Sequence, residues 1–542
     1  MSRWNVILFI TLIAFFLGIS FWQLDRFPTI HLDETIILEP GYNLFRTGHF
    51  NAPMYTGLQG REVIYLEVMP VMSLLQGAMS RLIGIGAWQM RVIPVLSGAI
   101  ILGLTFRIGG ELSKQGLHNS RVSIHSTSEL HSKNVVLAAI LSGFWLLFWK
   151  WTPGHEPFLE SGIALVDVGR IARYDILVPV FGLGAYLAWL KERWFLSGVL
   201  VGLAGLSNVY GFFWLAALLA LTAGDQVFFG RGDALRQAGK ILAGTFLAVL
   251  PWVVVILLNW PTFTAQFAQH GHRFQLFSPA FYWANLTHEV SRYHLGFGEI
   301  ASFARLGFWL AVVGIPVCLI GLAWRVIREK DRMAFYLLVP VMLLPFLLAV
   351  LIGEKKFYYL LMVIPLFAIL LGWGFAVWLG ANRRWQWAAW LILICIGIEG
   401  LVSIGSMQKR GFDITPTEFF SELQQNLPSE GIVLGPQPYW LAFPEGNYRS
   451  IHLPLLLANP YQKNPLSLTT ALEHISPAYI LVHPDWQSWL ATGWGPNGEE
   501  TAAEFWAYME VNQAALIYSA VDYEGKEVQI YELALITEAR KK

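Results

Sequence analysis

The stretch WFLSGVLVGLAGLSNVYGFFWLAALLALTAG, residues 194–224, carries no charged side chain over 31 positions. A helix needs about 20 mostly apolar residues to cross the roughly 30 Å hydrocarbon core of a bilayer, so this stretch is typical of a membrane protein. The segment SNVYG, 207–211, lies in its middle and predicts a tight turn between two short membrane helices. One long, tilted helix is the alternative.

The composition of the whole chain agrees with a membrane protein. Of its 542 residues, 55% are apolar and 14% are charged, against about 25% charged residues in a soluble domain. This hydrophobicity excludes intrinsic disorder. Lysine plus arginine and aspartate plus glutamate each number 37, so no net charge points to nucleic acid. Cys318 and Cys395 lie inside apolar runs, which excludes a disulfide framework and a cysteine zinc site.

Apolar runs along the chain predict eleven membrane helices. They lie at 4–24, 87–106, 134–149, 175–190, twice within 194–224, and at 241–260, 304–324, 333–353, 357–381 and 385–404. The first run is too long for a signal peptide and has no small-residue cleavage site. Residues 64–84 are also apolar but contain Glu67 and Arg81, so we expect a helix lying at the membrane surface there.

The distribution of cationic residues predicts the orientation of these spans. With the N-terminus in the cytoplasm, the cytoplasmic connections contain Arg107, Lys114, Arg121, Lys133, Lys191, Arg193, Arg231, Arg236, Lys240, Arg325, Arg328, Lys330, Arg332, Arg383 and Arg384. This agrees with the positive-inside rule. We therefore expect a plasma-membrane or inner-membrane protein with a cytoplasmic N-terminus and an exterior C-terminus.

The sequence predicts two domains. Residues 1–404 form a membrane domain with long exterior loops at 25–86 and 259–303. The tail 405–542 alternates short apolar runs, such as YILV at 479–482, with helical stretches, a pattern typical of an α/β unit. The expected fold class is therefore an all-α polytopic membrane protein with a small C-terminal exterior α/β domain.

The first exterior loop contains an acidic pair, Asp33-Glu34, just after His31. A carboxylate at a membrane boundary can act as a general base that takes the proton of an acceptor hydroxyl. The alternative is structural: Asp33 caps a short helix over 34–46, and Glu34 is favourable in its first turn. Both interpretations can hold, because a cap also fixes the position of the carboxylate.

Two cationic segments lie at the exterior ends of predicted spans. Arg170 and Arg173 are three residues apart and would share one face of a helix, with Asp175 opening the next span. Lys355 and Lys356 lie outside, against the positive-inside trend. Such cations suit a lipid phosphate, whereas interfacial anchoring by their long side chains is the structural alternative.

Four histidines gather in the second long exterior loop: His270, His272, His288 and His294. Their spacing matches no compact zinc motif. A loop that covers the substrate is therefore favoured over a metal site.

Taken in order, these motifs resemble the GT-C glycosyltransferases, especially the protein O-mannosyltransferase and aminoarabinose-transferase branch, which is glycosyltransferase family 39-like. The likeness covers about residues 5–380. Its elements are Asp33-Glu34 with Gly41-Tyr42-Asn43 behind it, Arg91-Val92-Ile93-Pro94, Arg170 and Arg173-Tyr174-Asp175, and Lys356-Phe357-Tyr358-Tyr359-Leu360 with Pro365. The chain departs from the branch at 62–67, EVIYLE, where a Pro-Pro element is frequent, and this leaves the donor sugar and the acceptor open.

The resemblance implies an inverting glycosyltransferase that moves a sugar from a polyprenyl-phosphate donor to an acceptor hydroxyl on the exterior side. It implies Asp33 as the general base and Glu34 as the group that orients Asp33 or the acceptor. Arg173 and the lysine pair would neutralise the departing phosphate. The substrate-binding residues implied are His31, Tyr42, Arg91, Arg170, Arg173, Asp175, Lys355, Lys356 and Tyr358.

The expected partners are the lipid-linked donor, the bilayer, and an acceptor that is a protein, a glycolipid or a glycan. No obligatory metal is expected, although some relatives need a divalent cation. Two other functions stay open. An oligosaccharide ligase or oligosaccharyltransferase would use a pyrophosphate donor, and Asp167 and Asp175 leave room for its metal. A lipid or sugar transporter would usually show repeated halves and charged or broken helices near the midplane, whereas this sequence shows no repeat and its ionisable residues cluster at the exterior ends of the spans.

Overall fold

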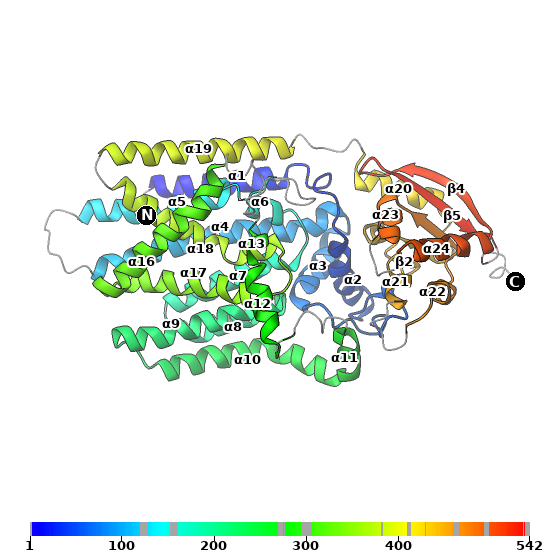
Figure 1. Cartoon of the computed structure of the whole chain (residues 1–542), viewed down its shortest axis with the longest axis horizontal. Helices are drawn as coiled ribbons and strands as arrows, with labels where there is room; N and C mark the ends of the chain where they lie inside the picture. The colour runs from blue at the N-terminus through cyan, green and yellow to red at the C-terminus, as the bar shows by residue number, and fades with distance from the viewer. Residues whose placement is uncertain are drawn as a thin grey trace.

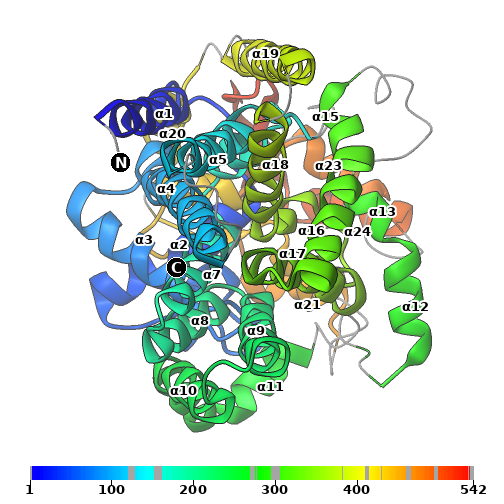
Figure 2. The ribbon, with the colours of Figure 1, turned by 90° about the vertical axis from the view of Figure 1, so that its left-hand side faces the viewer.

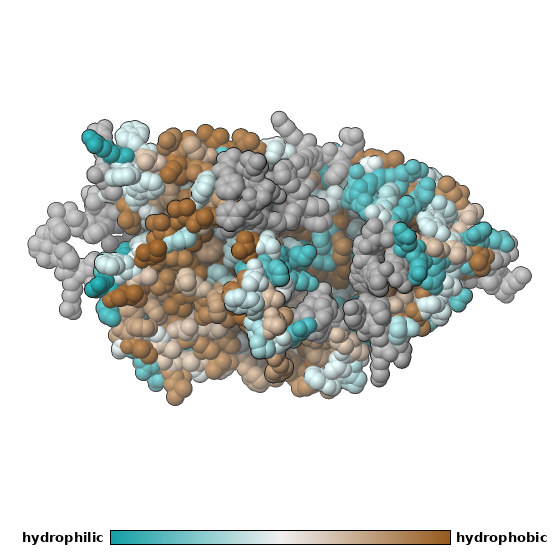
Figure 3. Space-filling view, viewed as in Figure 1, coloured by the Kyte–Doolittle hydropathy of each residue, from teal (hydrophilic) through white to brown (hydrophobic). Residues whose placement is uncertain are grey.

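The computed structural model describes residues 3–119, 128–151, 161–268, 275, 277–293, 305–380, 383–408, 414–428, 430–458, 465–492, 498–534 and 536. A bundle of long helices lies at one end of the molecule and the C-terminal domain at the other (Figure 1). Hydrophobic residues cover the visible face of the bundle, whereas hydrophilic residues gather on the C-terminal domain (Figure 3). We call the end of the bundle that meets the C-terminal domain the domain end.

Apolar helices occupy every predicted span. Six are long and apolar enough to cross a membrane, and five more are apolar helices of 10–17 residues, so the predicted polytopic helical architecture is confirmed. The bounds are α1 (Arg3–Phe21), α4 (Ala87–Asn119), α5 (Ser128–Phe148), α7 (Leu177–Leu190), α8 (Trp194–Ser207), α9 (Phe213–Phe229), α10 (Ala234–Leu258), α15 (Leu306–Trp309) continuing through the π-helical turn η5 (Leu310–Gly314) into α16 (Ile315–Glu329), α17 (Arg332–Leu351), α18 (Ile364–Leu379) and α19 (Arg383–Gln408).

The charge-free stretch 194–224 forms two helices, as its central turn signal predicts. Helix α8 ends at Ser207, and Asn208 is extended (φ −155°, ψ 143°) before the 3-10 turn η3 (Val209–Phe212) leads into α9. Gly211 permits the turn, because a Cβ at that position would lie 2.1 Å from the carbonyl oxygen of Ala204.

The bundle is layered around a buried centre. Viewed end-on, α4, α5 and α18 lie inside, and α10 and α19 lie at opposite rims (Figure 2). Burial agrees with this view, since 61% of the apolar window of α4 is buried within the protein but only 17% of that of α10. The outer helices therefore present their apolar side chains to lipid. Connections at 191–193, 230–233 and 330–331 lie at the end opposite the C-terminal domain (Figure 1).

Two helices of the first long loop, α2 (Leu32–Thr47) and α3 (Pro70–Ile83), lie between the bundle and the C-terminal domain (Figure 1). They pack backbone to backbone, because a Cβ on Gly41 would lie 1.7 Å from the carbonyl oxygen of Ser73. Helix α3 occupies most of the predicted surface helix at 64–84. Shorter elements of the domain end are η1 (Pro53–Tyr55), α6 (Ala164–Val168), η2 (Tyr174–Ile176), α11 (Trp260–Ala268), α12 (Pro279–Thr287), α13 (Glu289–Arg292) and η6 (Phe357–Met362).

The C-terminal domain is an α/β unit, as predicted. Its five-stranded sheet has the order β2-β1-β3-β5-β4; β1 pairs in parallel with β2 and β3, and β5 pairs antiparallel with β3 and β4. The strands are β1 (Val433–Gly435), β2 (Tyr448–Ser450), β3 (Tyr479–Val482), β4 (Ala514–Val521) and β5 (Glu527–Leu533). The helices are α20 (Pro416–Asn426), η7 (Gln437–Ala442), α21 (Leu453–Leu457), α22 (Leu468–Ile475), α23 (Pro484–Thr492) and α24 (Gly498–Val511).

Candidate functional site

The first turn of α2 positions the acidic pair. His31 is the N-cap: its ring Nδ1 accepts a hydrogen bond from the backbone N–H of Asp33 (3.1 Å), and its own N–H donates to Oε2 of Glu34 (2.9 Å). This capping box fixes the turn. Burial lowers the pKa of His31, which agrees with a neutral ring that uses Nδ1 as an acceptor. The prediction that Asp33 caps a helix over 34–46 is wrong: the helix begins at Leu32 and His31 is its N-cap, while Asp33 and Glu34 lie in its first turn.

The two carboxylates of the pair have different surroundings. The side chain of Asp33 is 29% exposed, whereas that of Glu34 is fully buried. Glu34 accepts from Nε and Nη2 of Arg91 (3.0 and 2.8 Å) and from the backbone N–H of Ala172 (2.6 Å), in addition to the N-cap. The hydrogen-bond partners of Glu34 are therefore all groups of the protein itself, whereas the Asp33 carboxylate is partly accessible.

Arg173 joins the acidic turn to the membrane helices. Its Nη1 pairs with Oδ2 of Asp33, and its Nε donates to Oδ2 of Asp175 at 2.9 Å. The other oxygen of Asp175 accepts from the hydroxyl of Tyr210 (2.6 Å) and the amide of Asn208 (3.3 Å), both in the turn between α8 and α9. Arg173 therefore joins Asp33 of α2 to Asp175, and Asp175 in turn joins the turn between α8 and α9. The Arg173 side chain is 3% exposed.

One nitrogen of this buried guanidinium, Nη2, makes no hydrogen bond with any described residue. The ring of Tyr358 lies 4.1 Å from the Cζ of Arg173, at cation–π distance. Lys356 precedes η6, is exposed, and has no side-chain partner in the described part of the chain. Of the predicted site residues, Asp33, Asp175 and Tyr358 contact Arg173, and His31 lies beside Asp33. We call Asp33, Arg173, Asp175 and Tyr358, together with Lys356 two residues before Tyr358 in the chain, the acid–arginine site.

Arg91 and Arg170, both predicted to bind substrate, are buried among contacts within the protein. Besides pairing with Glu34, Arg91 donates to the backbone oxygens of Leu24, Pro28 and Thr29. Arg170 is 2% exposed and donates to four backbone oxygens at the end of α1 and beyond, those of Ile19, Ser20, Gln23 and Phe27. Both arginines hold the chain after α1 in place, and the terminal nitrogens of both guanidinium groups donate to groups of the protein.

Lys355 and Tyr42, two more predicted substrate-binding residues, contact Glu289 and the C-terminal domain respectively. The ammonium of Lys355 lies 2.7 Å from Oε2 of Glu289 and donates to the backbone oxygens of Ala349 and Ile352, both at 2.8 Å. It therefore caps the end of α17. Tyr42 is nine residues beyond Asp33, about 13 Å along a helix, and packs edge-on against Trp440 of the C-terminal domain with the ring centroids 5.5 Å apart.

Asn208 and Tyr210 join the site although the sequence predicts only a turn at their SNVYG segment. Their signal is polar side chains inside a stretch of 31 residues without a charge, because such groups in a membrane need a polar partner. Asp167, considered for a metal, instead accepts from Ser161 and Gly162 in its own loop. His270, His272 and His294 lie outside the described residues.

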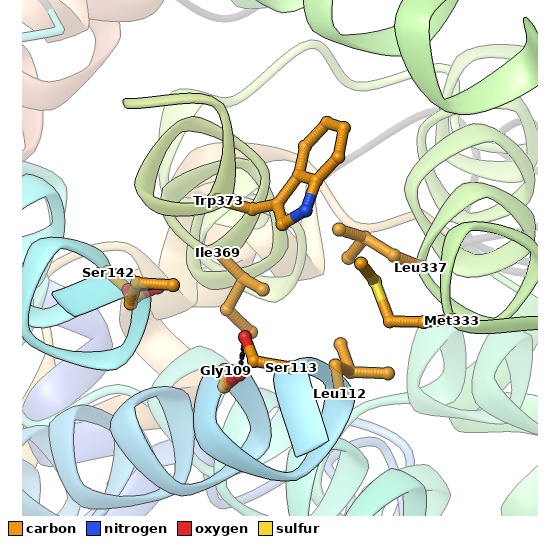
Figure 4. Close-up of a pocket in the computed structure, with 9 residues that line it drawn as sticks. Gly109, Leu112, Ser113, Ser142, Met333, Leu337, Ile369 and Trp373 are labelled. Carbon is orange, nitrogen blue, oxygen red and sulfur yellow. Dashed lines mark hydrogen bonds between the residues drawn. The ribbon is translucent and has the colours of Figure 1, made fainter. Parts of the chain in front are cut away.

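Within the described ranges, one group of three acidic or histidine side chains is close enough to share an ion: His483, Asp485 and Glu524 in the C-terminal domain. The ammonium of Lys526 already contacts both carboxylates of that group. A small cavity between α4, α5, α17 and α18 is lined by apolar and small residues such as Leu112, Ser142, Met333, Leu337 and Trp373 (Figure 4).

The fold of the chain is similar to that of solved membrane transferases. ArnT, the aminoarabinose transferase, from Cupriavidus metallidurans bound to undecaprenyl phosphate matches with a TM-score of 0.58 and 14% identity over 99% of both chains. The apo form of ArnT matches with a TM-score of 0.59 and 14% identity over 97% of this chain and 98% of that one. The Archaeoglobus fulgidus oligosaccharyltransferase matches with a TM-score of 0.55 and 12% identity over 90% of this chain and 70% of that one.

No protein-family model and no curated protein matches the sequence. The structural likeness at 12–14% identity establishes a shared fold over nearly the whole chain. The expected resemblance to GT-C proteins is therefore confirmed as a likeness of fold.

Proposed function

We propose that this chain is a membrane glycosyltransferase that moves a sugar from a polyprenyl-phosphate donor to an acceptor hydroxyl, with Asp33 as the general base. The observation that carries the proposal is the pair of a partly exposed Asp33 carboxylate and the Arg173 guanidinium in a fold shared with ArnT. The ArnT structure contains undecaprenyl phosphate, and an Archaeoglobus fulgidus AglB structure contains dolichol-phosphate. Both lipids belong to the class that we assign to the donor.

The cations of the acid–arginine site suit the leaving group. A sugar phosphodiester carries one negative charge, and the lipid phosphate that leaves carries nearly two at neutral pH. Nη2 of Arg173 and the exposed ammonium of Lys356 supply positive charge and hydrogen-bond donors for this developing charge. The Tyr358 ring lies 4.1 Å from the Cζ of Arg173 and stabilises the guanidinium by a cation–π contact. Lys355 and Arg170 are left out of this role because both side chains are buried among contacts within the protein.

The transfer is a single displacement. The acceptor hydroxyl gives its proton to the Asp33 carboxylate while its oxygen forms a bond with the anomeric carbon. The bond between the anomeric carbon and the phosphate oxygen breaks, and its electron pair leaves with the lipid phosphate. One displacement inverts the anomeric configuration. Glu34 and His31 hold the first turn of α2, so Asp33 is positioned before the acceptor arrives.

We assign this reaction to the exterior face of the membrane. The connections rich in lysine and arginine lie at the end opposite the C-terminal domain (Figure 1), and such connections favour the cytoplasm. The acid–arginine site would then face the exterior leaflet, with the C-terminal domain above it.

The test is transfer of labelled sugar from polyprenyl-phosphate hexoses by the purified full-length protein in nanodiscs. Wild type is compared with Asp33→Asn and with the control Asp25→Asn, which removes a carboxylate from the same loop outside the acid–arginine site. We expect transfer by wild type and Asp25→Asn and a loss of at least about 100-fold in Asp33→Asn, the range for a general base. Equal rates for all three would contradict the role of Asp33. Transfer only from a polyprenyl-pyrophosphate donor would replace the donor class.

A further inference from the structure

The C-terminal domain reaches into the turn that carries Asp33. Thr35 lies two residues beyond Asp33 and is fully buried. Its hydroxyl lies 3.2 Å from two backbone oxygens, that of Leu32 in its own turn and that of Gln437 in the C-terminal domain. A hydroxyl has one proton, so the two oxygens share it. This contact links positions that are 402 residues apart in the chain.

Gln437 is itself held from a second direction. Its side-chain Nε2 donates to the hydroxyl of Tyr55 at 2.7 Å, and both residues are buried. Tyr55 belongs to η1, in the same long loop as α2. A single residue of the C-terminal domain therefore bridges the start of α2 and the loop that follows it.

The segment that carries Gln437 is anchored in its own domain. The hydroxyl of Tyr439 donates to Asp522 at 3.0 Å, and that of Tyr448 donates to the backbone oxygen of Pro436 at 2.5 Å. Helix η7 is thus a fixed support against one face of α2. The other face meets α3 at the Gly41 close approach described above, so α2 is clamped between the two.

We infer that Thr35 and Gln437 are positioning residues: through them the C-terminal domain sets the place of the first turn of α2, and so of the Asp33 carboxylate. The inference rests on the proposed function and extends it, because it gives the C-terminal domain a part in the reaction without a contact to the substrate. A displacement of about 1 Å at a reacting group can cost about 100-fold in rate. Loss of the contact therefore lowers kcat more than it alters donor binding.

The test uses matched substitutions in the full-length protein. Thr35→Val keeps the shape and removes the hydroxyl, Thr35→Ser keeps the hydroxyl, and Gln437→Leu removes the amide that holds Tyr55. Thr47→Val is the control, since that exposed hydroxyl bonds only within α2, to the backbone oxygen of Asn43 at 2.9 Å. We expect kcat to fall about tenfold or more in Thr35→Val and Gln437→Leu, with donor KM within twofold of wild type. Thr35→Ser and Thr47→Val should retain wild-type kcat.

Hydrogen exchange at the amides of the first turn of α2 provides a readout that needs no substrate. Exchange should be faster in Thr35→Val and Gln437→Leu than in wild type and the Thr47→Val control. Wild-type kcat together with wild-type exchange in Thr35→Val would overturn the positioning role, and so would a lower melting temperature with unchanged kcat in the folded fraction. Absence of transfer by wild type itself would instead overturn the proposed function, so the two failures are distinct.

Discussion

Replacement of Glu34 by glutamine should destabilise the protein, although this residue neighbours the proposed base. Both side chains of the Glu34–Arg91 pair are fully buried. Glu34 accepts four hydrogen bonds, two from Arg91 and two from backbone N–H groups. A glutamine keeps one acceptor oxygen and turns an amide NH₂ toward donors. Removing one partner of a buried ion pair costs about 3–5 kcal/mol, because the other charge is left without compensation.

The assay is thermal denaturation of the purified variants in detergent, with Asp33→Asn as the matched neighbour. Asp33 is 29% exposed, so its loss of charge leaves Arg173 with the Asp175 carboxylate and should change the melting temperature little. Glu34→Gln and Arg91→Met should each melt well below wild type. The double variant should be less destabilised than the sum of the two, because the pair couples.

The opposite result would refute this reasoning. A Glu34→Gln protein that melts like wild type but transfers no sugar would show that Glu34 acts in the chemistry. In that case the exposed and the buried carboxylate would have to exchange roles.

Three further predictions concern the surroundings of the site. Gly41→Ala should lower the melting temperature, since overpacking of this kind costs about 1–3 kcal/mol or more, and a wild-type melting curve would contradict the close approach. Lys355→Ala should lower the melting temperature and leave the donor KM unchanged. Lys356→Ala should raise the donor KM and leave the melting temperature unchanged. The reverse pattern would assign the phosphate to Lys355. Burial raises the pKa of Glu39 to about 8, so between about pH 4.5 and 8 the folded protein keeps this carboxyl neutral while the unfolded chain ionises it. The free energy of unfolding is therefore highest below about pH 4.5 and falls, by at most about 1.4 kcal/mol per pH unit, as the pH rises toward 8. Glu39→Gln should therefore gain stability relative to wild type between pH 5 and 8, and parallel curves for the two proteins would contradict a buried Glu39 carboxyl.

The membrane helices could be predicted because each is a continuous apolar run. Burial inside the bundle and contact with lipid favour the same residue types, so the span positions do not depend on which helices touch. Strand β3 was visible for the same reason, since all four of its positions are buried. Strand β4 was not predicted: seven of its eight residues, AALIYSAV, are apolar although most of its side chains are exposed, so its sequence shows no alternation of buried apolar and exposed polar positions.

The site could be predicted only in part, because roles inside it depend on distant partners. Arg170 and Arg173 were expected to share a helix face, but α6 ends at Val168 and η2 begins at Tyr174. The chain between them is not helical, and the two guanidinium groups therefore serve different partners.

Neighbouring residues separate in a similar way elsewhere. Lys356 is extended (φ −86°, ψ 133°), and successive side chains of an extended segment point to opposite sides. Lys355 is buried against Glu289 while Lys356 is exposed. The partner of Glu34 lies 57 residues away, a distance that no local pattern can bridge.

The most direct test of the central claim is a structure of the Asp33→Asn protein with a bound polyprenyl-phosphate hexose, determined by electron cryomicroscopy in nanodiscs. The account predicts the phosphate beside Nη2 of Arg173 and the ammonium of Lys356, with the anomeric carbon facing Asn at position 33. A phosphate bound at the end of the bundle opposite the C-terminal domain, or away from Arg173, would contradict it.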